Sequence, residues 1–175
     1  MKALLCTLLL ASSLAVAAQP DEAAIKAQLA DYFFEAARNG RTDMLATFIE
    51  AGYDLDTQDA KGYSALILAA YHGHAEAVDA LLTAGANPCL QDQRGNTALM
   101  GAIFKAELGI ARRLMQADCP TDQRNAAGQT AAMYAALFQR TELLEALRRK
   151  GADLDLKDAM GNDAHSLASG EIRTR

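Results

Sequence analysis

Asp59-Ala-Lys-Gly-Tyr-Ser-Ala-Leu66 recurs, with changes, three more times along this chain. The later copies are Asp92-Gln-Arg-Gly-Asn-Thr-Ala-Leu99, Asn125-Ala-Ala-Gly-Gln-Thr-Ala-Ala132 and Asp158-Ala-Met-Gly-Asn-Asp-Ala-His165. Their glycines, at positions 62, 95, 128 and 161, are separated by a constant step of 33 residues. A fixed period of this length is typical of repeat architectures, in which similar units stack on one another.

Each unit reads as a turn followed by two short helices. The glycine occupies a turn position that needs positive φ, and Ser64, Thr97 or Thr130 follows it as an N-cap. Apolar residues at helical spacing then form two runs, Leu66, Ala69 and Ala70 in the first and Val78, Leu81 and Leu82 in the second. Gly73 separates the two helices, and Gly85 ends the second in the left-handed conformation. One such pair cannot bury its own apolar face, so stacking must stabilise it.

These residues resemble the ankyrin repeat. Ala69-Ala-Tyr-His-Gly-His74 and Leu81-Leu-Thr-Ala-Gly-Ala-Asn87 are similar to two of its signatures. The resemblance implies an all-α ankyrin-repeat solenoid over residues 31–169, with four repeats and a C-terminal half-repeat cap. Residues 19–38 are expected to form an N-terminal capping helix, with Asp21 as its N-cap and an apolar face of Ile25, Leu29, Tyr32, Phe33 and Ala36. Residues 170–175 are expected to be a frayed tail.

The chain departs from the family pattern at several positions. The family's histidine, which ties neighbouring turns together, is replaced by Ile67, Met100 and Met133. We therefore expect those ties to be weaker or absent. Asp118 replaces the glycine that ends the second helix of the third unit, at some backbone cost.

Residues 1–18 have the pattern of a secretory signal peptide: Lys2, an apolar run from Leu4 to Val16, and small residues at 15–18. An uncleaved membrane anchor is the alternative, although the apolar run is short for a bilayer span. We expect export to a bacterial periplasm, with no stable membrane insertion after cleavage. The exported chain retains Cys89 and Cys119. An oxidising compartment invites a disulfide, but an offset of one repeat plus three extended residues argues against it.

The net charge of −5 over 175 residues disfavours a nucleic-acid partner. The chemistry of a catalytic or metal site is also missing from the pattern, because His72, His74 and His165 do not converge with cysteines or acids at ligand spacing. We therefore expect no enzyme activity, no metal and no cofactor.

Surface recognition remains. In similar proteins, partners bind along the turn tips and the concave face of the first helices. Here these positions place aromatic and apolar side chains about one repeat apart, which is typical of interfaces, unless the rings fold back into the core. The predicted partner-binding residues are Arg38, Lys61, Tyr63, Tyr71, His72, Arg94, Asn96, Phe104, Lys105, Gln129, Leu137 and Phe138.

The leading hypothesis is a monomeric, exported module that binds another protein in a preformed groove. The resemblance extends to small exported bacterial proteins that accompany oxidative-defence enzymes such as catalases. One competing hypothesis is an immunity or inhibitor protein that blocks a toxin or hydrolase. Another is a binder of small molecules or metals.

Overall fold

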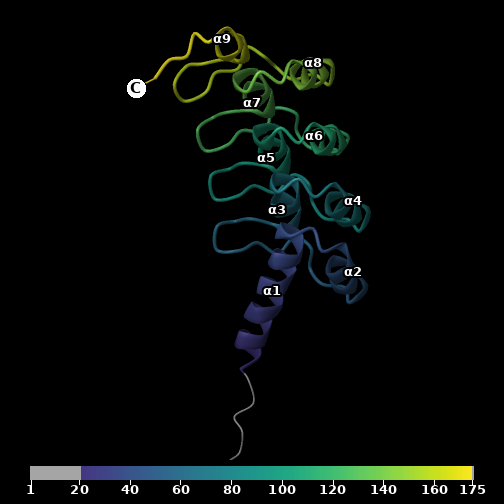
Figure 1. Cartoon of the computed structure of the whole chain (residues 1–175). Coiled ribbons are helices and arrows are strands. Elements are labelled where there is room, and N and C mark those ends of the chain that lie inside the picture. Colours follow the sequence, from purple (N-terminus) through teal and green to yellow (C-terminus); the bar gives the residue numbers. More distant parts are fainter. Residues whose placement is uncertain (1–20, 175) are drawn as a thin grey trace, which may run out of the picture.

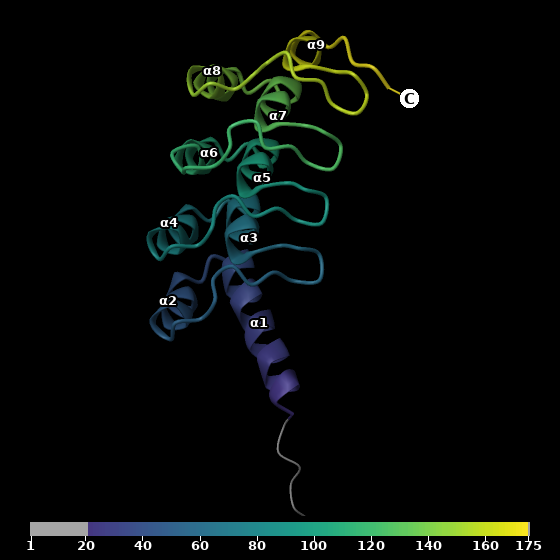
Figure 2. The same ribbon diagram turned by 180° about the vertical axis from the view of Figure 1, so that it is seen from behind.

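The computed structural model describes residues 21–174, and the expected signal peptide lies outside them. Over this range the chain forms two rows of helices and a row of loops (Figures 1 and 2). The inner row comprises α1 (Glu22–Arg38), α3 (Ala65–Tyr71), α5 (Ala98–Lys105), α7 (Ala131–Leu137) and α9 (Ala164–Ser169). The outer row comprises α2 (Thr42–Glu50), α4 (Ala75–Thr83), α6 (Leu108–Leu114) and α8 (Thr141–Arg149). This arrangement confirms the all-α repeat solenoid.

The N-caps and turn glycines have the geometry that the sequence predicts. The side chains of Ser64, Thr97 and Thr130 each accept a hydrogen bond from the backbone N–H three residues later, as N-caps do. The four turn glycines have φ between 75° and 83°. Each unit then packs its inner helix against the inner helices of its neighbours, which buries Leu66 and Ile103 completely or almost completely.

The third unit (residues 92–124) and the fourth unit (residues 125–157) keep this geometry without glycine between their helices. Ala106 and Gln139 take the place of Gly73 and adopt left-handed backbone, with φ of 64° and 55°. An alanine costs about 1–2 kcal/mol in that region, because its Cβ crowds the following carbonyl oxygen. The repeat therefore dictates the backbone even where the side chain disfavours it.

The turns are tied by glutamines, so the expectation of weak or absent ties was wrong. Gln91 Nε2 donates to the carbonyls of Gly95 in its own turn and Arg124 in the next, at 2.6 and 2.8 Å. Gln58, one repeat earlier, donates in the same way to the Gly62 and Gln91 carbonyls. The hydrogen-bonding role of the missing family histidine thus passes to residues four positions before the turn glycine.

The third unit ends differently from the others. Gly85 and Gly151 have positive φ after α4 and α8, whereas Asp118 at the equivalent position does not. The loop after α6 takes another path, and Lys150 Nζ donates to the carbonyls of Met115 and Ala117, the latter at 2.8 Å. A lysine from the fourth unit thus satisfies the Met115 carbonyl, whose counterpart Leu82 accepts a hydrogen bond from Gly85 N at 3.1 Å in the second unit.

Cys89 and Cys119 form a disulfide, with their Cα atoms 5.5 Å apart, so the argument from spacing was wrong. It assumed that the chain runs extended from residue 86 to Cys89. Instead, the Asn87 side chain accepts a hydrogen bond from Cys89 N at 3.0 Å, and the chain turns at Pro88 and Cys89. This turn brings Cys89 beside the loop of the next unit.

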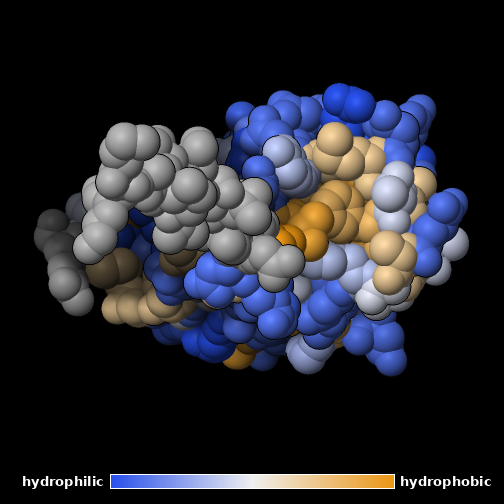
Figure 3. Space-filling model, turned by 90° about the horizontal axis from the view of Figure 1, so that it is seen from below, coloured by the Kyte–Doolittle hydropathy of each residue, from blue (hydrophilic) through white to orange (hydrophobic). Residues whose placement is uncertain are grey.

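At the N-terminal end, α1 extends beyond the stack (Figure 1). Phe33 and Ala36 are buried as expected, but Ile25, Leu29 and Tyr32 are 42%, 43% and 51% exposed. The predicted apolar face therefore exists, but no helix among the described residues covers its first half. The view from this end shows orange apolar surface among blue hydrophilic residues (Figure 3).

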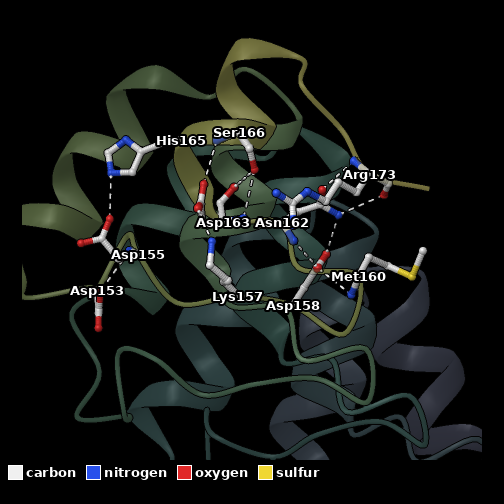
Figure 4. Close-up of polar contacts among 10 residues, drawn as sticks. All are labelled: Asp153, Asp155, Lys157, Asp158, Met160, Asn162, Asp163, His165, Ser166 and Arg173. Carbon is white, nitrogen blue, oxygen red and sulfur yellow. Dashed lines mark hydrogen bonds and ion pairs between the residues drawn. The ribbon is translucent and has the colours of Figure 1, made fainter. Parts of the chain in front are cut away.

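The C-terminal half-unit, residues 158–169, closes the other end (Figure 4). Asp163 and Ser166 form a capping box at the start of α9. The buried Asn162 accepts a hydrogen bond from Arg173 N at 2.7 Å and donates one to the Arg173 carbonyl at 3.2 Å. We expected residues 170–175 to be a frayed tail, so these contacts of Arg173 were not predicted. Arg175 lies outside the described residues.

The disulfide closes a loop with a sequence separation of 30 residues. A cross-link of this length stabilises the folded state by about 3–4 kcal/mol in the chain-entropy account. We predict that replacing both Cys89 and Cys119 with serine lowers the free energy of unfolding by this amount, measured by urea denaturation. Reductant should lower the midpoint of the wild type but not that of the double variant. Equal midpoints under oxidising conditions would contradict the prediction.

The left-handed Ala106 gives a second prediction. Ala106→Gly should raise the free energy of unfolding by about 1 kcal/mol, because glycine adopts φ of 64° without crowding. The matched control is Ala84→Gly. Ala84 is also exposed and also follows a helix, but its φ is −80°, so glycine there should stabilise nothing. A loss of stability in Ala106→Gly would contradict this account.

Candidate functional site

An open groove of about 580 Å³ runs between the inner helices and the turn tips of the second and third units (residues 59–91 and 92–124). We call it the groove. Two turns, 59–63 and 92–96, form one side, and α3 and α5 form the floor. The loops lie beside the inner helices on the side away from the outer row (Figures 1 and 2). The groove therefore follows directly from the stacking of the repeats.

Many of the predicted partner-binding residues line this groove. They are Arg38, Lys61, Tyr63, Tyr71, His72, Arg94, Asn96 and Phe104. Lys105, Gln129, Leu137 and Phe138 are not part of the lining. Leu137 is half-buried and packs against a small core cluster between α7 and α9. The predicted surface therefore divides into a groove and a neighbouring region toward the C-terminus.

Aromatic rings form the exposed apolar part of the groove. Tyr71 and Phe104 stack with their planes 12° apart and their centroids separated by 6.1 Å. They remain 38% and 45% exposed, so they do not fold back into the core. Phe138 is half-buried and extends the row through an edge contact with Phe104 at 5.2 Å. Lys105 Nζ lies 5.1 Å from the centre of the Tyr71 ring.

A polar network holds the turn tips that border the rings. Asn96 Oδ1 accepts hydrogen bonds from the Tyr134 hydroxyl at 2.9 Å and from Asn125 Nδ2 at 3.0 Å. Asn125 Nδ2 also donates to Gln129 Oε1 at 3.2 Å. Burial raises the pKa of Tyr134, which keeps its hydroxyl protonated as a donor. Asn96 thus ties its turn to the next unit, and Gln129 braces Asn125 within its own turn.

The acidic side chains of the groove's turns are engaged in hydrogen bonds with the backbone, whereas the basic side chains at the turn tips are not. Asp59 Oδ1 accepts the backbone N–H groups of Lys61 and Tyr63, at 2.8 and 2.9 Å, and Asp92 does the same in the next turn. By contrast, Lys61 and Arg94 are exposed and form no ion pair among residues 21–174. The turn carboxylates serve the fold, and the two cations remain available to a ligand.

His72 and Arg38 lie at the α1 end of the groove. Arg38 Nη1 donates to Glu35 Oε2 at 2.9 Å, so the Arg38 guanidinium is already part of an ion pair. Burial lowers the pKa of His72, and the neighbouring His74, Arg38 and Lys105 lower it further. The lowered pKa favours the neutral form of His72. The groove's available positive charge lies on lysine and arginine.

Sequence reasoning missed part of the lining, including Leu68, Met100, Gly101 and Tyr134. Leu68, Gly101 and Tyr134 are one repeat apart on the inner helices. Glycine at position 101, where the units before and after have leucine and tyrosine, was the sequence feature that could have revealed this part of the lining. It is visible only when the units are aligned position by position.

Residues 21–174 contain no group of three or more histidine, cysteine or acidic residues placed to hold a metal ion. None of the helices in that range is long and apolar enough to cross a bilayer. The groove presents the aromatic rings of Tyr71 and Phe104, the amide of Asn96 and the exposed cations Lys61 and Arg94.

The exposure of the rings gives a prediction about their role. Phe104→Ala should change the free energy of unfolding by less than about 1 kcal/mol, because the ring is 45% exposed. Leu81→Ala, at a fully buried position, should cost about 2–5 kcal/mol. Thermal and chemical denaturation measure both. Comparable losses in the two variants would show that Phe104 is a core residue.

A family profile described as ankyrin repeats in three copies matches residues 33–125 and, in an overlapping match, residues 78–158. Comparison with curated proteins gives no match. Ankyrin repeats generally mediate interactions between proteins and are generally not enzymes. The matched residues, the helical hairpins and the constant period agree, and the chain belongs to the ankyrin-repeat family.

Proposed function

We propose that this protein is an exported, non-enzymatic module that holds a partner protein in the groove and against the turn tips. The stacked, solvent-exposed pair of Tyr71 and Phe104 is the observation that carries the proposal. Partly exposed aromatic rings in a concave surface are the usual anchors of protein interfaces. Hydrogen bonds between the turns hold the surface in place, so binding requires little rearrangement.

The bacterial periplasm is the location that we propose. Two independent features support it: the signal-like pattern of residues 1–18 and the Cys89–Cys119 disulfide. Disulfides persist in oxidising compartments and are rare in the cytosol. An oxidative-defence enzyme such as a catalase is the partner class to test first. That choice rests on the resemblance to small exported bacterial ankyrin proteins.

The proposal is tested by cross-linking in the native host. Tagged wild-type protein and the Tyr71→Asp variant are expressed at equal levels, and complexes are isolated from the periplasmic fraction. We predict that the wild type retains a stoichiometric partner that Tyr71→Asp loses, because the aspartate places an unpaired charge against the apolar ring surface. Asp153→Asn, at an exposed position of the loop after α8, is the control and should retain the partner.

Two readouts separate the possible outcomes. N-terminal sequencing of the periplasmic protein should find a chain that starts near Gln19, and a cytosolic full-length chain would refute export. The activity of the captured partner separates an accessory factor from an inhibitor, since addition of the ankyrin protein should preserve or raise activity in the first case. Retention of every partner by Tyr71→Asp would refute binding in the groove.

A further inference from the structure

One position on the floor of the groove breaks the pattern of its row. Leu68, Gly101 and Tyr134 occupy equivalent positions on α3, α5 and α7, and all three line the groove. Large side chains flank the glycine on both sides along the stack. A Cβ at Gly101 would meet only atoms of Tyr71 within 4 Å, so the groove floor is open at this position, and we call this space the depression.

The backbone gives no reason for glycine at this position. Gly62 and Gly95 need glycine because their φ is positive, but Gly101 lies within α5 and has no positive φ. A Cβ at Gly101 would lie 3.7 Å from Tyr71 Cδ2, which is ordinary van der Waals contact. Glycine is less favourable than alanine within a helix. The glycine therefore weakens α5 and leaves the space beside Tyr71 open.

The walls of this space are apolar. The rings of Tyr71 and Phe104, with their centroids 6.1 Å apart, line it, and so do Leu68 and Tyr134, which lie one repeat before and one repeat after Gly101. Met100 contributes to the lining from the neighbouring position of α5. A flat ring from a ligand would stack against these rings and lie close to the α5 backbone, where a side chain at position 101 would obstruct it.

The rim of this space carries positive charge. Lys61 and Arg94, at the tips of adjacent turns, are exposed and unpaired among the described residues. Asp59 and Asp92 accept backbone N–H groups of their own turns. Asp31, also in the lining, belongs to α1 and not to these tips. Asp59 and Asp92 are half-buried and keep their charge, whereas the exposed charges of the two tips are the cations Lys61 and Arg94, although the whole chain carries −5.

We propose that the depression over Gly101 receives one aromatic side chain from an acidic segment of the partner protein. Lys61 and Arg94 then bind the carboxylates that flank this side chain. This inference rests on the proposed function and adds the chemistry of the bound segment. It assigns Gly101 a role in specificity, because the space it leaves selects a ring.

A fluorescein-labelled peptide with one central phenylalanine flanked by glutamates is the probe, and fluorescence polarisation measures its binding. We expect Gly101→Leu to weaken binding by more than about tenfold, because the leucine fills the depression. Gly109→Leu is the matched control: Gly109 lies on the outer helix α6, and a Cβ there would meet nothing within 4 Å. Both variants should keep the wild-type helicity and melting temperature or exceed them.

Two further peptides test the two halves of the proposal. Replacing the phenylalanine by glycine, or the glutamates by lysines, should each weaken binding to the wild type by more than about tenfold. Double replacement of Lys61 and Arg94 by glutamine should reduce the preference for glutamate over lysine.

Two results would overturn this inference. One is a wild type that binds the glycine or lysine peptide as tightly as the original, or that binds none of the peptides. The other is a Gly101→Leu variant that retains full affinity. These failures are distinguishable from failure of the proposed function. If Tyr71→Asp loses the periplasmic partner while Gly101→Leu retains it, the inference fails but binding in the groove stands; if Tyr71→Asp retains every partner, the proposed function itself fails.

Discussion

Backbone hydrogen bonds between successive turns set the geometry of the whole stack. Gln93 N donates to the Lys61 carbonyl at 3.0 Å, and the same bond recurs 33 positions later, where Ala126 N donates to the Arg94 carbonyl at 2.8 Å. This contact requires glycine twice over. The turn needs positive φ, and a Cβ at Gly62 would lie only 2.7 Å from Gln93 N. Any inserted residue would break both conditions, which explains the constant period.

The same contact builds the groove. Because successive turns are held at one spacing, Lys61 and Arg94 occupy equivalent places on adjacent tips, and Tyr71 and Phe104 fall into stacking distance on adjacent helices. Substitutions of groove side chains that leave the 33-residue period intact therefore change the groove surface without changing the fold. A binding site can arise in such a molecule by substitution alone, since each unit contacts only its neighbours.

The fold could be predicted because its determinants are local: a glycine, a capping hydroxyl and two apolar runs in each unit. The exposure of Tyr71 and Phe104 could be predicted for the same reason, from their place before the helix-ending position. The disulfide could not, because the Asn87 side chain redirects the chain toward Cys119. The glutamine ties also escaped prediction, since Gln91 performs the family histidine's role from a different position.

Several departures from the repeat lie in the third unit, residues 92–124. That unit contains the strained Ala106, the irregular loop at Asp118 and the helix-weakening Gly101. Ala106 and Gly101 reduce its intrinsic stability. Lys150 from the fourth unit and the disulfide from the second unit hold it from both sides. Because neighbours stabilise a solenoid unit, this one can tolerate residues chosen for the groove rather than for the fold.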